Sequence, residues 1–399
     1  MEYMTVREAA RRWAVTERLV QRLCSEGRIE GAVKFGGSWG IPVGARKPGD
    51  PRRADARAAA GRPRRVPGAH ANLMPLMNTA FAPGAGAEFV DALEPGPRRD
   101  IARAELAYFS GKPREADAEA GRYLGCDDLD TRFSACLICA YANLPLGRIG
   151  RARRALEAAR GAIEAASAEN PQLRAAEAFI AATASVLLHL PLPDNLPDAR
   201  DVLPLLPPGL RMFACYVQAH MLYLQGRYAE SLGVAEAALM MLEDVYPIPA
   251  IYLHLVAVMD LMSLREAGRA RGHLLAAWEL ARPDDLIEPF GEHHGLLGGM
   301  LEAVIKPVWP DDFKSIIAIT YSFSAGWRRI HNPATGDDVA DDLTTTEFAA
   351  SMLAARGWTN QEIASHMDVS VNTVKSYVSR SLAKLGITRR QDLGKFMLS

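Results

Sequence analysis

The chain is poor in cysteine and lacks a long apolar run. It has five cysteines among 399 residues, an odd number that does not favour a disulfide framework. Its first residues show no secretory signal, and no apolar stretch reaches the length that a membrane-spanning helix needs. We therefore expect a reduced, cytoplasmic protein without a membrane partner. A chain of this length is also expected to fold as two or three domains.

Motifs for catalysis and cofactor binding are missing as well. No G-x-x-x-x-G-K-S/T loop occurs, which excludes an ATPase of that kind. Cys136 and Cys139 form a C-x-x-C in an apolar helical pattern, and without a second pair this favours a core position over a zinc site. Glu292, His293 and His294 are the one cluster of catalytic residue types, and their apolar context favours a surface or interhelix role. The sequence thus predicts no enzyme, no metal and no cofactor.

The formal net charge of −1 hides two basic ends and an acidic middle. Residues 1–70 contain 15 Lys and Arg against 7 Asp and Glu, and residues 343–399 contain 7 against 4. The segment between them contains the remaining 24 basic and 36 acidic residues. We expect the basic ends to meet nucleic acid and the acidic middle to have another role.

The C-terminal segment has the spacing of a helix-turn-helix. Thr344 offers an N-cap hydroxyl for a first helix that ends near Arg356. Thr359 and Glu362 form a capping box for a second helix, and a tight turn at 368–370 leads to a third. A third helix over 371–385 would expose a polar face able to enter the major groove. Its other face would bury one apolar stripe: Val371, Val374, Val378, Leu382 and Leu385.

This segment resembles the LuxR-type C-terminal domain over about 57 residues. The motifs that carry the resemblance are Asn360–Ala364, Val369–Ser370, Thr373–Lys375, Val378–Arg380 and Lys384–Gly386. It implies a four-helix domain that reads double-stranded DNA, although a packing module without DNA contact is the alternative. The resemblance departs at Tyr377, where many relatives have His, and at Ser379, where many have a basic residue. The DNA-contacting residues that it implies are Thr359, Ser370, Asn372, Thr373, Lys375, Ser376, Tyr377, Ser379, Arg380 and Lys384.

Residues 1–48 have the pattern of a second, smaller reader. Thr5 and Glu8 predict a capping box for a helix through about Trp13. Thr16 caps a second helix that ends before Gly27, and residues 33–41 alternate as a hairpin around two glycines. Two helices followed by a hairpin predict a small winged helix-turn-helix.

The N-terminal segment is similar to the excisionase or MerR-like family. Met4–Ala10, Trp13 and Val33–Gly36 are among the matching residues. The resemblance implies that the second helix enters the major groove while the hairpin touches the DNA backbone, and a protein-docking module is the alternative. The implied DNA-contacting residues are Thr16, Arg18, Gln21, Arg22, Lys34 and Ser38.

The middle of the chain is repetitive and predicted to be helical. Residues 49–70 are rich in Pro, Gly and Arg and predict a linker. After it, glycine turns at Gly111 and Gly147 lie 36 residues apart, and those at Gly226 and Gly268 lie 42 apart. Such a period predicts stacked helix pairs over 71–335. Leu222–Tyr228 resembles a tetratricopeptide repeat, and residues 286–305 resemble the repeat region of MalT-like LuxR regulators.

The predicted protein is therefore mainly α: a winged helix-turn-helix at 1–48, a TPR-like α-solenoid at 71–335 and a LuxR-type domain at 336–399. These parts predict a transcriptional regulator that binds double-stranded DNA. The resemblance to LuxR-type domains implies a homodimer joined through a helix at about Arg389–Met397. The repeats would bind a small-molecule or protein effector, and RNA polymerase is a further candidate partner. A repeat-based interaction scaffold tethered to DNA by its ends is the alternative.

Overall fold

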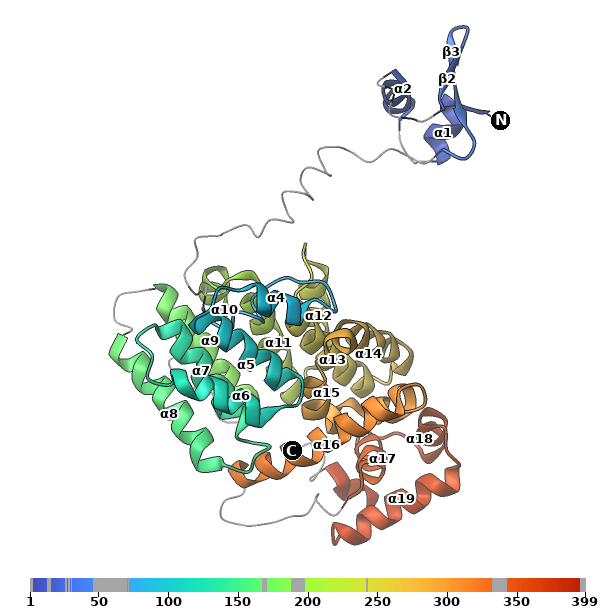
Figure 1. The fold of residues 1–399 in the computed structure, drawn as a ribbon. Helices are drawn as coiled ribbons and strands as arrows, with labels where there is room; N and C mark the ends of the chain where they lie inside the picture. The colour runs from blue at the N-terminus through green and yellow to red at the C-terminus, as the bar shows by residue number, and fades with distance from the viewer. Residues whose placement is uncertain are drawn as a thin grey trace. The chain divides into compact units, whose positions relative to one another are not determined.

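The chain divides into two units, Met1–Pro67 and Gly68–Ser399, in the computed structural model (Figure 1). The structure describes residues 3–12, 16–25, 27, 29, 31–45, 70, 72–166, 171–187, 198–241, 243–331 and 343–394. Three sequence predictions fall outside these ranges: the linker over 49–70 apart from His70, the helix end at Trp13, and residues 395–397 of the predicted dimerisation helix.

A small antiparallel sheet and two helices form the first unit. The order is β1 (Tyr3–Thr5), α1 (Val6–Arg12), α2 (Glu17–Ser25), β2 (Val33–Phe35) and β3 (Ser38–Pro42). β3 is the central strand, and it pairs Ile41 with Met4 of β1 and Trp39 with Lys34 of β2. We did not predict β1 from the sequence, because three residues are too few to show an alternating pattern.

Hydrogen bonds start both helices of this unit at the predicted residues. Thr5 N donates to Glu8 Oε2 at 2.7 Å, and Glu8 N donates to Thr5 Oγ1 at 3.3 Å, which makes the capping box. Leu19 N donates to Thr16 Oγ1 at 3.4 Å at the start of α2. The hairpin turns at Gly36, whose φ of +59° suits a residue without a Cβ.

The second unit begins with consecutive helices that pack as hairpins, and we call α4 to α16 the helical array. Among the described helices, α5 packs on α6, α7 on α8, α11 on α12, and α13 on α14, and Figure 1 shows these hairpins side by side. The helices of the array are α4 (Gly86–Ala92), α5 (Pro97–Phe109), α6 (Pro113–Ala120), α7 (Leu129–Ala142), α8 (Ile149–Ala166), α9 (Pro171–Leu187), α10 (Ala199–Val202), α11 (Pro208–Leu224), α12 (Tyr228–Met240), α13 (Pro247–Ser263), α14 (Ala267–Ala281), α15 (Glu288–His293) and α16 (Pro310–His331). Short 3-10 and π turns join some of them, among which η4 (His294–Leu297) is used below.

One type of turn closes four of these hairpins. After α5, α7, α11 and α13, an amide donates to the carbonyl five residues earlier, as in a Schellman C-cap: Lys112 to Ala107, Arg148 to Asn143, Arg227 to Leu222 and Glu266 to Leu261. The cap needs a positive φ, which Gly111, Gly147 and Gly226 supply at the predicted turns. The predicted turn at Gly268 was wrong. Arg265, with a φ of +65°, makes the fourth turn, and Gly268 lies inside α14.

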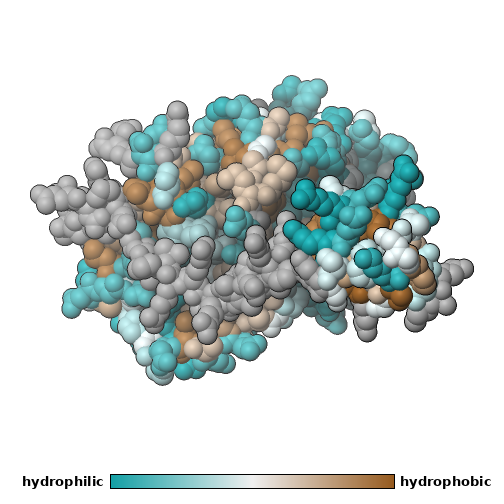
Figure 2. Space-filling view, turned by 90° about the horizontal axis from the view of Figure 1, so that it is seen from above, coloured by the Kyte–Doolittle hydropathy of each residue, from teal (hydrophilic) through white to brown (hydrophobic). Residues whose placement is uncertain are grey.

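Large side chains fill the interior of the array. Tyr216, Phe133 and Phe290 are among its fully buried residues. Cys136 and Cys139 lie in this core on α7, and burial raises the pKa of their thiols to about 11 and about 12. On the face in Figure 2, hydrophobic residues form separate patches among hydrophilic ones. No helix in the described ranges is long and apolar enough to cross a membrane.

Three helices and a 3-10 turn end the described chain. They are α17 (Thr345–Ala355), α18 (Asn360–Met367), α19 (Val371–Lys384) and η6 (Arg390–Leu393). The first three agree with the helices predicted from caps and periodicity. They pack on the array, so that the regions predicted as 71–335 and 336–399 lie within one unit.

The buried side chain of Glu105 fixes the backbone at the start of the second unit. Glu105 on α5 is fully buried and accepts hydrogen bonds from Leu76 N at 2.8 Å and Met77 N at 3.0 Å. Leu73 and Leu76 of this segment are themselves fully buried. The carboxylate therefore satisfies two backbone amides of a non-helical segment that packs in the core.

We expect Glu105→Ala to lower the free energy of unfolding by about 2–4 kcal/mol, because it leaves two buried amides without an acceptor. Glu94→Ala, at an exposed loop position, is the control and should change stability by less than about 0.5 kcal/mol. Urea denaturation of the full chain measures both. Equal effects of the two substitutions would contradict the assigned role.

Candidate functional site

Side-chain caps set where α18 and α19 begin. Thr359 N donates to Glu362 Oε2 at 2.6 Å, and Glu362 N donates to Thr359 Oγ1 at 3.2 Å, so the predicted capping box is present. At the turn, Asp368 adopts a left-handed φ of +51°, and Ser370 Oγ then accepts from Thr373 N at 3.0 Å. These bonds define how α19 departs from α18.

α19 has one buried face and one exposed face. Val374 and Val378 lie in the core, as the apolar stripe predicted. Thr373 and Tyr377 are half-buried, at the edge between the two faces. The exposed face therefore presents amine, amide and hydroxyl groups of the types that meet DNA base edges and phosphates. The exposed members of the predicted set are Thr359, Ser370, Asn372, Lys375, Ser376, Ser379, Arg380 and Lys384.

Two of the predicted DNA-contacting cations also bind a carboxylate of the same domain. Lys384 Nζ donates to Glu347 Oε2 at 2.8 Å, and Arg380 Nε lies 3.4 Å from Glu347 Oε1. The Glu347 side chain is only 2% exposed, and it accepts from Thr344 N at 3.0 Å to complete the capping box of α17. Arg380 and Lys384 thus join α19 to α17, in addition to any contact with DNA.

The start of α18 has a basic neighbour that the sequence did not single out. Arg390 Nη1 donates to Asn360 Oδ1 at 2.5 Å, and its Nη2 donates to Trp358 O. Arg390 belongs to η6, 30 residues away along the chain from Asn360. No local spacing links the two residues, so only the folded domain could show this contact.

Comparison with known proteins agrees with this geometry. Residues 341–397 match the family model described as bacterial regulatory proteins, luxR family. The C-terminal domain is of LuxR type. It is similar to a segment of the DNA-binding transcriptional activator DevR/DosR of Mycobacterium tuberculosis, with 40% identity over 68 residues. The alignment covers 17% of this chain and 31% of the relative, so the chain spans about a third of the length of the curated relative it matches. The chain has no significant match among solved structures.

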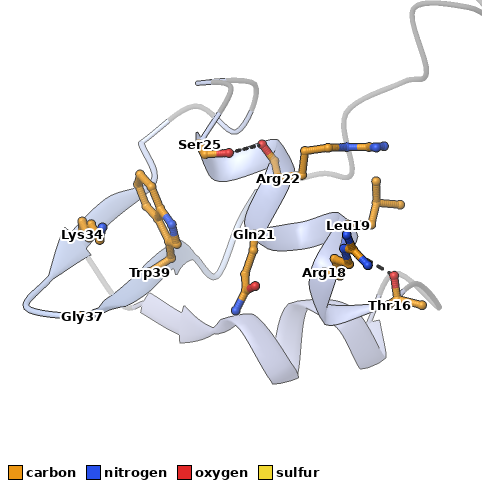
Figure 3. A pocket seen from close by; sticks show the side chains of 9 residues that line it. All are labelled: Thr16, Arg18, Leu19, Gln21, Arg22, Ser25, Lys34, Gly37 and Trp39. Atoms are coloured by element: carbon orange, nitrogen blue, oxygen red, sulfur yellow. Dashed lines mark hydrogen bonds between the residues drawn. The ribbon is translucent and has the colours of Figure 1, made fainter.

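The N-terminal unit has an open hollow between α2 and the β2–β3 hairpin. Its volume is about 770 Å³. Figure 3 shows side chains of α2 on one side of it and those of Lys34 and Trp39 on the other. Lys34 Nζ lies 5.9 Å from the centroid of the Trp39 ring, which holds the amine beside the hollow. Of the six residues predicted here, five line the hollow: Thr16, Arg18, Gln21, Arg22 and Lys34.

Other residues also line the hollow, and one predicted residue does not. Ser38, the sixth predicted residue, is exposed on β3 but is not part of the lining. Leu19 and Trp39, whose apolar character indicated core positions, pack against the small core of this unit and also line the hollow. Ser25 also lines it, and its spacing of four residues from Gln21 places both on one helical face.

The catalytic-type cluster in the array consists of residues with separate partners. Glu292 accepts hydrogen bonds from Tyr108 and Tyr252, and the Tyr252 bond measures 2.8 Å. His293 Nε2 lies 2.8 Å from Tyr216 Oη, while His294 Nε2 lies 2.8 Å from Glu302 Oε1. These contacts join neighbouring helices, which agrees with the interhelix role. Within the described ranges, no group of three or more His, Cys, Asp or Glu is arranged to hold a metal ion.

The ion pairs of Glu347 should make the stability of the LuxR-type domain fall at acid pH. Burial raises the pKa of Glu347, but the Lys384 and Thr344 hydrogen bonds and the charge of Arg380 outweigh it, so the pKa lies below its ordinary value of 4.5. A depressed folded pKa stabilises the domain above pH 4.5, and this contribution is lost as the pH falls through the folded pKa.

We therefore expect Glu347→Gln to be less stable than the parent at neutral pH and to lose less stability on acidification. Hydrogen exchange of α17 amides as a function of pH measures the difference. Glu279→Gln, on the exposed surface of α14, is the control and should follow the parent curve. Parallel curves for the parent and Glu347→Gln would contradict the ion-pair role.

Proposed function

We propose that this chain is a DNA-binding transcriptional regulator rather than an enzyme. The observation that carries the proposal is the LuxR-type domain at residues 341–397, whose third helix presents an exposed polar face. The basic charge of residues 343–399 favours contact with phosphates. DNase footprinting of the host genome at physiological salt is the test. Discrete protected sites are expected, and uniform binding without such sites would overturn the proposal.

We further propose that the regulator binds DNA as a homodimer. The LuxR-type resemblance favours pairing through the segment at Arg389–Met397, with RNA polymerase as a further partner at the promoter. Two identical readers related by a two-fold axis would bind a pseudo-palindrome, with half-sites about one helical turn apart. Spacing of the protected half-sites in the footprint checks this arrangement.

A second reader in the N-terminal unit belongs to the same proposal. Five of the six residues assigned from the resemblance line one hollow, with arginines on α2 and a lysine on the hairpin. A helix and an adjacent hairpin with basic side chains match the shape of a winged reader, whose helix enters a groove while the hairpin meets the backbone. The helical array between the readers is proposed to be a TPR-like region that binds an effector.

We expect the double substitution Lys375→Ala and Ser379→Ala to reduce the preference for target over random DNA roughly 10- to 100-fold, because it removes base-facing groups. Residual, salt-sensitive binding should remain through phosphate contacts. Competition binding with target and random duplexes measures the ratio. Lys314→Ala, at an exposed position on α16, is the charge control and should keep the preference. A retained preference in the double variant would mean that another element selects the site.

We expect Arg18→Ala with Arg22→Ala to weaken DNA binding and to lower the slope of log affinity against log salt by about 2, because two phosphate contacts are lost. The matched control is Arg7→Ala with Arg11→Ala, which removes the same charge from the exposed surface of α1. Affinity measured over a salt series distinguishes the pairs. Equal changes in both would show a general charge effect and contradict a reader at the hollow.

A further inference from the structure

The last helices of the array return to its first hairpin. α15 packs against α5 as well as against α13 and α16. Tyr108 of α5 donates a hydrogen bond to Glu292 of α15, although the two residues lie 184 positions apart. A Cβ on Gly111, one turn after Tyr108, would lie 2.9 Å from Ile319 Cδ1 and 3.8 Å from Glu288 Oε2. We call this contact between the end of α5 and α15 the closure of the array.

Two carboxylates lie together at the closure. Glu288 and Glu292 are four residues apart on α15, which places both on one face of the helix with about 5–6 Å between their Cβ atoms. Both reach the same end of α5, where Glu292 meets Tyr108 and Glu288 lies beside Gly111. Among the described residues, neither carboxylate forms an ion pair with Lys or Arg. Two negative charges in such a place repel each other, so the pair favours holding a proton.

The two carboxylates differ in their hydrogen-bond donors. Glu292 accepts from Tyr108 and from Tyr252, the latter at 2.8 Å, and both tyrosines are buried. Glu288 is 1% exposed, and its Oε1 is buried without a hydrogen-bond partner in the described part of the chain. Donors stabilise the ionised form of a carboxyl group, whereas burial without donors disfavours it. The proton of the pair therefore belongs on Glu288, while Glu292 is the acceptor of the phenols.

The side chains around the pair supply neutral donors. Burial and the charge of Glu292 raise the pKa of Tyr108 and of Tyr252 well above 10, so both phenols keep their protons. Both ring nitrogens of His293 have neutral partners, because Pro289 O and Tyr216 Oη each lie at 2.8 Å. The titratable and charged side chains on the elements around the pair are Tyr108 and the exposed Lys112 at the end of α5, Tyr141 of α7, Tyr216 and His220 of α11, Tyr252 of α13, His293 of α15, and the paired His294 and Glu302 beyond it.

We propose that Glu288 and Glu292 form a proton-binding site, which stabilises the closure of the array while it holds a proton and loosens the closure when the proton leaves. Glu288 binds the proton as a neutral carboxylic acid. On release, two carboxylates face each other in a buried place, and their repulsion separates α15 from α5.

The proton-binding site is connected to the LuxR-type domain through the chain itself. η4 follows α15 directly. Arg356 Nη2, at the end of α17, donates to Leu296 O of η4 at 2.8 Å, and His366 Nε2 of α18 lies 3.1 Å from Gly298 O. Movement of α15 would therefore weaken the contacts that hold the LuxR-type domain. This regulatory meaning rests on the proposed function, whereas the proton-binding site does not.

The direction of the pH dependence follows from the burial of the pair. Burial raises the pKa of Glu292 to about 7, although the Tyr108 and Tyr252 hydrogen bonds lower it. Burial and the charge of Glu292 raise the pKa of Glu288 well above its ordinary value of 4.5. A raised folded pKa stabilises the closure fully below pH 4.5, and this contribution is lost as the pH rises through the folded values. The closure should therefore weaken as the pH rises toward neutral and mildly alkaline values.

The first test measures hydrogen exchange of the α15 amides in the full chain, without DNA, from about pH 5.5 to about pH 7.5. After correction for intrinsic exchange, protection in the parent should fall at least about tenfold per pH unit. Glu288→Gln keeps the shape of the neutral acid, and its slope should be shallower by about tenfold per pH unit. Glu279→Gln, on the exposed surface of α14, is the control and should keep the parent slope. An unchanged slope in Glu288→Gln would overturn the proposal.

A local and variant-based measurement is needed because other buried acids titrate in the same range. Burial also raises the pKa of Glu105 and of Asp260 to about 8. The global stability therefore does not isolate the pair. The amides of α17 test the connection to the LuxR-type domain: their protection should fall with pH in the parent and less so in Glu288→Gln. Protection of α17 that is independent of pH would contradict the connection.

A second test detects the proton itself. At about pH 7, the infrared spectrum of the parent minus that of Glu288→Gln should contain the C=O stretching band of a protonated carboxylic acid. The same difference taken with Glu279→Gln should lack it, because an exposed glutamate is ionised at this pH. Absence of the band from the first difference would overturn the assignment of the proton to Glu288.

These outcomes are separate from those of the DNA experiments. A chain with the expected slopes and infrared band but no discrete footprint would retain the proton-binding site and lose the regulator proposal. A discrete footprint with equal slopes in the parent and Glu288→Gln would have the opposite meaning.

Discussion

The passage of the Arg356 guanidinium into the helical array is the interaction on which the arrangement of the second unit depends. Its Nη2 bonds to Tyr223 and to the carbonyl of Leu296, so that the end of α17 is tied to α11 and η4 at once. A buried charge that loses such partners is strongly unfavourable. The LuxR-type domain therefore shares one buried core with the array, and its position is set by contacts with α11 and η4.

Within that domain, the exposed cations Arg380 and Lys384 also form ion pairs that stabilise the fold. Glu347 is nearly fully buried and joins the start of α17 to Arg380 and Lys384 on α19. The C-terminal half of α19 is thus joined to α17, while Lys375 and Ser379 remain exposed near the middle of α19.

Much of the fold could be predicted from local spacing, and the features that were missed give no local signal in the sequence. A capping box needs two residues three positions apart, so the box of Thr359 and Glu362 could be predicted from the sequence, and the structure contains it. The hairpin turn at Gly36 could also be predicted, because glycine between two alternating segments indicates a turn with positive φ. The turn at Arg265 was missed, because a non-glycine residue with positive φ gives no signal of its own. Trp39 was interpreted as part of the hairpin core, and it does pack against that core, but its place in the lining of the hollow depends on where α2 lies in the folded unit.

The sequence by itself determined where α1, α2, α17, α18 and α19 begin, which face of α19 is apolar, and that the C-terminal segment has a LuxR-type pattern, because each depends on residues within a few positions of one another. Only the tertiary structure decided where Arg356 goes. Its acceptor Tyr223 lies 133 positions away in the chain. A contact between residues so far apart in the sequence leaves no local pattern, so only the folded chain brings the two side chains together.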